Sequence, residues 1–242
     1  MAFTRQEASQ EYNQALKLGL KNQKECIAKG IDPTPPVLDD ILNESESAGQ
    51  VELGVIDIPT DRIIGTKTTG RITAFSRNFL PVFSDGTEFA SKWINICMVH
   101  MSDSGSLEPI RCFEYLGKFY VQEGNKRVSV YKYFEAPTIA GYVIRIIPKY
   151  SEEPEIQRYY DFLHDYRFTG SYDIVFTQPG GFQKLQAALD YSPDHVWTEE
   201  ERRFFRSRYL TFKNAYEKLG GSDLPITVMD AMLVWLKVYP YQ

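Results

Sequence analysis

A glycine followed by two cations, placed between a strand-like run and a helical pattern, is the part of this sequence best suited to bind an anion. Residues 119–134 read FYVQEGNKRVSVYKYF, which predicts a strand, a turn at Gly124 and a helix that starts at Asn125. The first amides of a helix have no intrahelical acceptor, and the positive end of the helix dipole lies beside them, so a phosphate can accept from them. Lys126 and Arg127 would add charge-assisted hydrogen bonds, and Ser129 completes the candidate set. An ordinary turn with solvated cations explains the same residues equally well.

A second segment concentrates positive charge. Residues 62–84 contain four cations and no acidic residue, although Asp and Glu outnumber Lys and Arg by 32 to 27 in the whole chain. Within it, GTKTTGR at 65–71 supplies two glycines and three hydroxyls, a composition typical of a loop that folds over an anion. Thr66, Lys67 and Arg71 are therefore further candidate phosphate ligands. The segment is not a Walker A loop, because Gly70 is followed by arginine and not by lysine.

These motifs together resemble the ParB/sulfiredoxin superfamily over residues 51–149. The resemblance depends on Ile58-Pro59 with Ile63, Arg71 after a short loop, Pro109-Ile110, and Gly124-Asn125-Lys126-Arg127. It implies a small mixed sheet with helices, and a Gly-x-x-Arg turn that grips the phosphates of ATP or CTP, with Mg²⁺ accompanying the nucleotide. The runs GTKTTGR, EFASKW and FYVQEGNKRVSV further resemble a ParB-like module of clostridial proteins associated with substrate-binding proteins of the basic-membrane-protein type.

The sequence departs from this family at Asn125. Sulfiredoxins, which this part of the chain resembles, have their catalytic cysteine at this place. Asn125 has an amide instead of a thiol, so we do not expect this chain to reduce sulfinic acids. Chromosome-partitioning members have a glutamate at the same place, so hydrolysis of the nucleotide is in doubt while nucleotide binding is retained. Glu123 lies one residue earlier, where the similar free-serine kinases hold an acidic residue, and is the candidate catalytic base. The alternative for Glu123 is an exposed charge at the end of a strand.

The composition of the chain argues against several other classes of protein. A formal net charge of −5 argues against a large nonspecific nucleic-acid surface, so DNA is an unexpected partner. Cys26, Cys97 and Cys112 are odd in number and far apart, which indicates reduced, mostly buried thiols with no zinc site. The sequence shows no cluster of metal ligands. The N-terminal residues lack the apolar core of a signal peptide, and no apolar run approaches a membrane span, so we expect a cytoplasmic protein.

The chain is expected to have three parts and an α+β fold. Residues 1–50 predict an N-terminal helical arm and a linker, comprising a helix at 4–29, a short helix at 37–42 and a polar linker at 43–49. Residues 51–149 form the ParB/sulfiredoxin-like part. Strands are predicted there at 51–55, 111–115, 118–122 and 139–147, and the second and third flank Leu116-Gly117 as a hairpin. A helix is predicted at 88–101 that stops by Gly105.

Residues 150–242 predict a mainly helical region. The capping box Thr198-Glu199-Glu200-Glu201 begins a helix with an aromatic stripe, and further helices are expected at 182–189 and 226–239. Arginines between 202 and 208 alternate with that stripe, which favours a solvated helix face over a nucleic-acid surface. The apolar ending is compatible with a fused downstream domain.

Three functions follow from these expectations. The first is a bacterial regulatory module that binds a nucleoside di- or triphosphate and changes an interaction surface for a protein partner. The second is an enzyme, either a small-molecule phosphotransferase or kinase that uses Glu123 as its base, or a ParB-like nuclease. The third is a DNA-binding partition-type protein, which fold-level similarity cannot establish.

Overall fold

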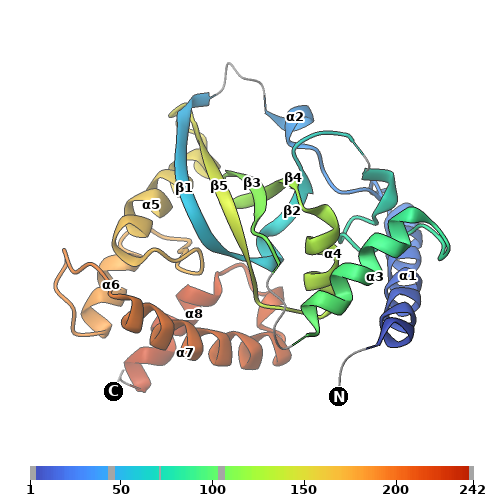
Figure 1. The fold of residues 1–242 in the computed structure, drawn as a ribbon. Coiled ribbons are helices and arrows are strands. Elements are labelled where there is room, and N and C mark those ends of the chain that lie inside the picture. Colours follow the sequence, from blue (N-terminus) through green and yellow to red (C-terminus); the bar gives the residue numbers. More distant parts are fainter. Residues whose placement is uncertain (1–3, 43–46, 71, 103–106, 240–242) are drawn as a thin grey trace. The chain divides into compact units, whose positions relative to one another are not determined.

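The computed structural model describes residues 4–42, 47–70, 72–102 and 107–239 of the 242-residue chain. These residues form eight α-helices, short 3₁₀ turns and one five-stranded sheet (Figure 1). The expected α+β class is confirmed. The chain divides into two compact units, residues 1–149 and residues 150–242.

The sheet belongs to the first unit and is mixed. Its strand order is β1 (Ser47–Pro59), β5 (Thr138–Pro148), β3 (Ile110–Tyr115), β4 (Lys118–Glu123) and β2 (Ile63–Thr66). The β1–β5 and β3–β4 pairs are antiparallel, whereas β5–β3 and β4–β2 are parallel. The hairpin between β3 and β4 has the turn that the sequence predicts. Its two turn residues, at 116 and 117, both have positive φ, as the tightest hairpin turns require.

Two expectations for the sheet were wrong. The first strand is much longer than 51–55 and begins at Ser47, inside the expected linker, of which 43–46 lie outside the described residues. Gly65 and Thr66, expected in an anion-binding loop, are instead in β2 and pair with Tyr120 and Val121. The parallel partner of this short strand lies more than fifty residues away, so no local pattern in the sequence marks the strand.

The helices of the first unit are α1 (Arg5–Ala28), α2 (Leu38–Ile41), α3 (Glu88–His100) and α4 (Asn125–Tyr133). A capping box between Thr4 and Glu7 begins α1, and the Thr87 hydroxyl caps α3. The helix α3 ends at His100, so the expected stop at Gly105 falls outside the described residues.

The N-terminal helix is part of the first unit and not a separate arm. Helices α1, α3 and α4 lie beside one another (Figure 1) and share a buried cluster. Tyr12 of α1 packs edge to face against Trp93 of α3, with ring centroids 5.4 Å apart. The indole of Trp93 donates to the buried Ser129 hydroxyl of α4 at 2.9 Å. This packing fixes the positions of the N-terminal ends of α3 and α4.

The second unit contains α5 (Pro154–Thr169), α6 (Gly181–Ala188), α7 (Glu199–Lys218) and α8 (Val228–Val238). The predicted capping box of α7 is present, since Glu201 N–H donates to Thr198 Oγ1 and Thr198 N–H donates to the Glu201 carboxylate. Sequence reasoning did not identify α5, although its proline at the first helical position and Gly170 at its end are both typical helix boundaries.

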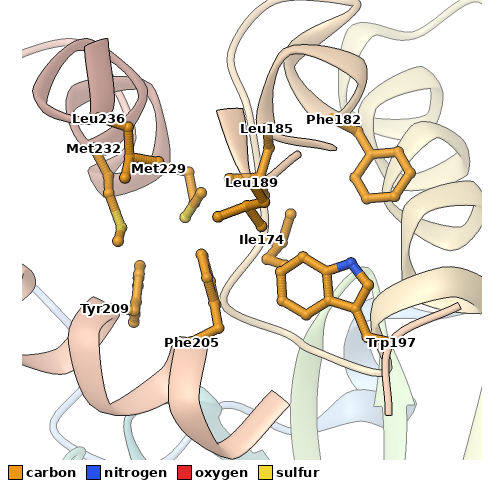
Figure 2. Packing of buried hydrophobic residues seen from close by; sticks show 10 residues of the cluster. All are labelled: Ile174, Phe182, Leu185, Leu189, Trp197, Phe205, Tyr209, Met229, Met232 and Leu236. Atoms are coloured by element: carbon orange, nitrogen blue, oxygen red, sulfur yellow. The ribbon is translucent and has the colours of Figure 1, made fainter. Parts of the chain in front are cut away.

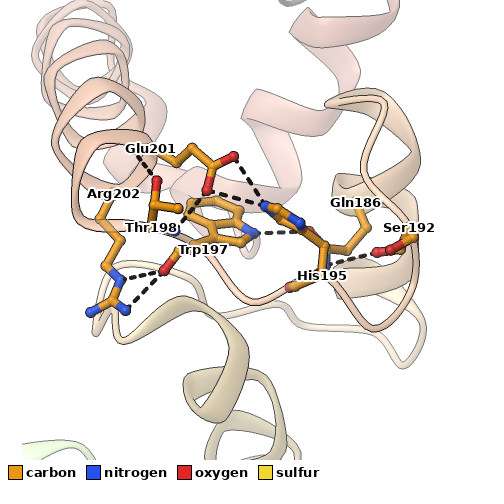
Figure 3. Close-up of polar contacts among 7 residues, drawn as sticks. All are labelled: Gln186, Ser192, His195, Trp197, Thr198, Glu201 and Arg202. Carbon is orange, nitrogen blue, oxygen red and sulfur yellow. Dashed lines mark hydrogen bonds and ion pairs between the residues drawn. The ribbon is translucent and has the colours of Figure 1, made fainter.

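The core of the second unit consists of aromatic and aliphatic side chains and two methionines. Its members come from α6, α7, α8 and the segments between α5 and α7 (Figure 2): Ile174, Phe182, Leu185, Leu189, Trp197, Phe205, Tyr209, Met229, Met232 and Leu236. Figure 3 shows the polar contacts that hold the segment before α7. The buried Gln186 amide donates to the carbonyls of Ser192 and His195 and accepts from the Trp197 indole at 2.9 Å. These bonds satisfy the buried polar groups of a loop that carries a core tryptophan.

Candidate functional site

The turn at Gly124 has the geometry that the sequence predicts. Strand β4 ends at Glu123, Gly124 adopts a left-handed conformation with φ of 106°, and α4 begins at Asn125. The Val128 amide donates to the Gly124 carbonyl at 3.0 Å, so the amides of residues 125–127 precede the intrahelical bonds of α4. Glycine has no side chain to cap them. The positive end of a nine-residue helix therefore lies at this turn.

Close packing makes glycine necessary at position 124. A Cβ atom there would lie 2.5 Å from Cγ2 and 2.9 Å from Cβ of Ile110, a fully buried residue of β3. Both distances are shorter than a carbon–carbon contact allows. The turn thus combines a backbone conformation that favours glycine with a close approach to the neighbouring strand.

Arg127 is bound within the protein. Its guanidinium donates to the carbonyls of Glu108 and Pro109, the latter at 3.1 Å, and forms an ion pair with Glu123. The side chain is only 11% exposed. Arg127 therefore connects the end of β4 and the start of α4 to the segment that enters β3, and it holds the turn in place.

Lys126 lies on the other side of the turn, toward α3. Its ammonium is 5.1 Å from the centroid of the Phe89 ring, a cation–π distance. Asn125 is the first residue of the helix, and its Oδ1 atom is buried without a hydrogen-bond partner among the described residues. Buried amide oxygens in proteins nearly always have a donor, so this position is unusual.

These residues border a pocket of about 840 Å³ in the first unit. Residues 122–127 form one wall. The first turns of α3 form another, with Thr87, Glu88, Phe89, Lys92, Asn95 and Ile96. The segments before α3 contribute Gly70, Thr73, Ala74, Phe75 and Phe83. The pocket thus brings together the N-terminal ends of two helices, α3 and α4.

Charges on the described lining residues favour an anion slightly. The cations Lys92, Lys126 and Arg127 face the carboxylates of Glu88 and Glu123, which leaves one positive charge in excess. The dipoles of α3 and α4 add to it. The Glu123 carboxylate is 62% exposed and paired with Arg127, so it is at once a strand-end charge and a pocket carboxylate.

Three of the expected phosphate ligands lie elsewhere. Thr66 is buried, and its hydroxyl donates to the Thr68 carbonyl at 2.9 Å. The Lys67 ammonium pairs with Asp39 and lies 5.4 Å from the Phe113 ring centroid. The Ser129 hydroxyl is the buried acceptor for Trp93. Arg71 lies outside the described residues, although its neighbour Gly70 lines the pocket.

Sequence reasoning missed the wall that α3 contributes. The spacing of Phe89 with Trp93 and His100 predicts an apolar helix face, and this face does pack inward at the fully buried Trp93. Phe89 sits at the edge of that face and also borders the pocket. His100 packs against the rings of Tyr131 and Phe134 at 4.5 and 5.4 Å, and burial lowers the pKa of its imidazole. Only the packing of α3 on α4 decides which residues of this helix face the core and which border the pocket.

Comparisons with known proteins identify no relative: no protein-family model, curated protein or solved structure matches this chain. The described ranges contain no group of three or more His, Cys, Asp or Glu side chains arranged to hold a metal ion. No helix within them has both the length and the apolar character needed to cross a bilayer.

Proposed function

We propose that this chain is a ParB/sulfiredoxin-like regulatory module that binds the phosphates of ATP or CTP at residues 124–127. The observation that supports this most is the pocket of about 840 Å³ with the N-terminal turn of α4 in its wall. Its volume lies in the range of small-molecule sites. The N-terminus of a helix preceded by a left-handed glycine suits phosphate, because its first amides donate to the anion and the positive end of the helix dipole attracts it.

Each residue of the turn has a distinct role in this proposal. Gly124 gives the turn its left-handed conformation and leaves the first amides of α4 without a side-chain cap, and Lys126 supplies a cation beside them. Arg127 mainly holds the turn in place, because its guanidinium already donates to two carbonyls and pairs with Glu123. Lys126 is therefore the better residue to test, since replacing Arg127 would also release the turn.

The pocket residues fit a magnesium ion that arrives with the nucleotide. Mg²⁺ prefers oxygen ligands and usually takes most of them from substrate phosphates and water, with one or two carboxylates from the protein. Glu123 and Gln122 both line the pocket, and a carboxylate and an amide oxygen are ligands of the right chemical type. Magnesium would neutralise part of the triphosphate charge there.

A phosphotransferase is the second candidate, and Glu123 is the observation that favours it. A carboxylate on the wall of a phosphate site could accept the proton of a small hydroxyl substrate. In the described structure, however, Glu123 is paired with Arg127, and it would have to leave this ion pair to act as a base.

Binding to DNA receives little support from the arginines of α7. Arg202 donates to the Trp197 carbonyl (Figure 3), Arg206 lies 3.9 Å from Asp173, and the Arg208 guanidinium lies 5.6 Å from the Trp235 ring centroid. These side chains thus contribute to the helical unit itself. A protein partner, or a fused downstream domain, is a more suitable binding partner than DNA for a surface that changes when the nucleotide binds.

The proposal places the protein in the cytoplasm. All three cysteines are free and buried, as is usual in a reducing compartment. Nucleoside triphosphates and magnesium are both available there.

Calorimetry with ATP and CTP, each with Mg²⁺, tests the proposal. We expect wild-type binding and a loss of about 10- to 150-fold in affinity for Lys126→Ala, since a charge-assisted hydrogen bond contributes about 1.5–3 kcal/mol. Lys24→Ala, an exposed substitution in α1, removes the same charge away from the pocket and should leave the affinity unchanged. Absence of binding by the wild type, or equal affinities for both variants, would refute the phosphate site.

A further inference from the structure

Phe83 is an exposed aromatic residue on a fixed backbone. The residue is 40% exposed and belongs to the lining of the pocket. The fully buried Tyr12 hydroxyl donates to the Phe83 carbonyl at 2.6 Å, and the Thr87 hydroxyl donates to the Ser84 carbonyl at 3.0 Å. The chain around Phe83 is therefore held from both sides. A large apolar ring kept at a pocket wall in this way suits a binding surface.

A short aromatic row supports this ring. Phe83 and Phe89 pack edge to face with centroids 5.7 Å apart, and Phe89 packs in the same way on the buried Phe75 at 5.2 Å. The row continues to the proposed phosphate site, because the Lys126 ammonium lies 5.1 Å from the Phe89 centroid. One wall of the pocket thus passes from a cation to an exposed aromatic ring.

A nucleotide has the same order of chemical groups. Its phosphates require cations and amides, and its base presents two flat faces that stack on aromatic side chains. A cavity of about 840 Å³ is also larger than phosphate groups alone would fill. A bare polyphosphate or a sugar phosphate would leave Phe83 in contact with water.

We infer that Phe83 is the base-stacking residue of this pocket, so that the ligand is a nucleoside di- or triphosphate and not a phosphate compound without a planar ring. This inference rests on the proposed phosphate site at the start of α4. Stacking depends little on the identity of the base, because every base has a flat π-face. The platform therefore accepts both adenine and cytosine, and discrimination between them must come from other contacts.

The test compares nucleotides with a ligand that has phosphates only. Calorimetry should measure ATP, CTP and inorganic tripolyphosphate, each with Mg²⁺, on wild type, Phe83→Ala, Phe83→Leu and Phe83→Tyr. We expect a loss of about 5- to 150-fold in nucleotide affinity for alanine, the range found for one base stacked on one aromatic side chain. Leucine should lose a similar factor and tyrosine should retain the affinity, whereas tripolyphosphate should bind all four proteins equally.

A matched control and a spectroscopic measurement complete the design. Tyr142→Ala removes another exposed aromatic ring of the first unit, outside the pocket lining, and should not alter nucleotide affinity. In Phe83→Trp, the introduced indole should change its fluorescence on adding ATP or CTP, but not on adding tripolyphosphate.

The outcomes separate this inference from the proposed function. If Phe83→Ala binds ATP and CTP as wild type does while Lys126→Ala weakens every ligand, the phosphate site stands and the stacking role is refuted. Equal losses for nucleotides and tripolyphosphate would also refute stacking, because the ring would then only shape the pocket. If neither class of ligand binds wild type, the proposed function and this inference fail together.

Discussion

Replacing Gly124 by alanine tests the turn at the centre of the site. Alanine would have to adopt φ of 106°, and the left-handed region costs a residue with a Cβ about 1–2 kcal/mol. The same Cβ would meet Ile110 at 2.5 and 2.9 Å, and overpacking of this kind costs a further 1–3 kcal/mol or so. Gly124→Ala should therefore lower the free energy of unfolding of the first unit by about 2–5 kcal/mol.

Gly86→Ala is the matched control for the cost of placing alanine in a left-handed conformation. Gly86 has φ of 82°, and a Cβ there would meet no atom within 4 Å. Its substitution should cost only the conformational part, about 1–2 kcal/mol. Combining Gly124→Ala with Ile110→Ala removes the methyl group nearest to the new Cβ. The cost of the glycine substitution should fall by about 1–3 kcal/mol in that background.

Hydrogen exchange measured by mass spectrometry at several urea concentrations suits this comparison. Peptides from residues 1–149 and 150–242 report the two compact units separately, so an effect on one unit is not averaged over the other. If Gly124→Ala and Gly86→Ala destabilise the first unit equally, within about 0.5 kcal/mol, the close approach to Ile110 does not restrict position 124 and the reasoning is wrong.

Two further predictions concern a partly buried lysine and the chemistry of the pocket. Burial lowers the pKa of Lys132 to about 8, so Lys132→Met should raise the free energy of unfolding below pH 8, by about 3 kcal/mol at most. This gain should shrink as pH rises from 8 toward 10.5, where the native lysine is neutral; urea unfolding that shows a constant difference at pH 7 and 10 would contradict it. Hydrolysis of ATP or CTP should be slow or absent because Asn125 cannot accept a proton from water, and a phosphate-release assay should show turnover only after Asn125→Glu. Rapid wild-type turnover that Glu123→Gln abolishes would show instead that Glu123 is a general base.

Local signals in the sequence determined several elements correctly. The capping box at Thr198 and Glu201 specifies the start of α7 through bonds within one turn, and the tight turn after Tyr115 specifies the β3–β4 hairpin. The glycine before Asn125 marks the start of α4 in the same way. Each of these depends on residues only a few positions apart, so the types and order of the residues suffice.

Tertiary structure alone decided which candidate residues meet. Thr66 belongs to a strand whose parallel partner is β4, and Lys67 pairs with Asp39, so neither lines the pocket with Lys126. Arg127 looks like a free phosphate ligand in the sequence, but carbonyls nearly twenty residues earlier bind it. Phe83 packs on Phe89 of α3 and so borders the same pocket as residues 124–127. Such contacts join residues distant in the chain, and their partners are fixed by the packing of the whole unit and by no pattern within one segment.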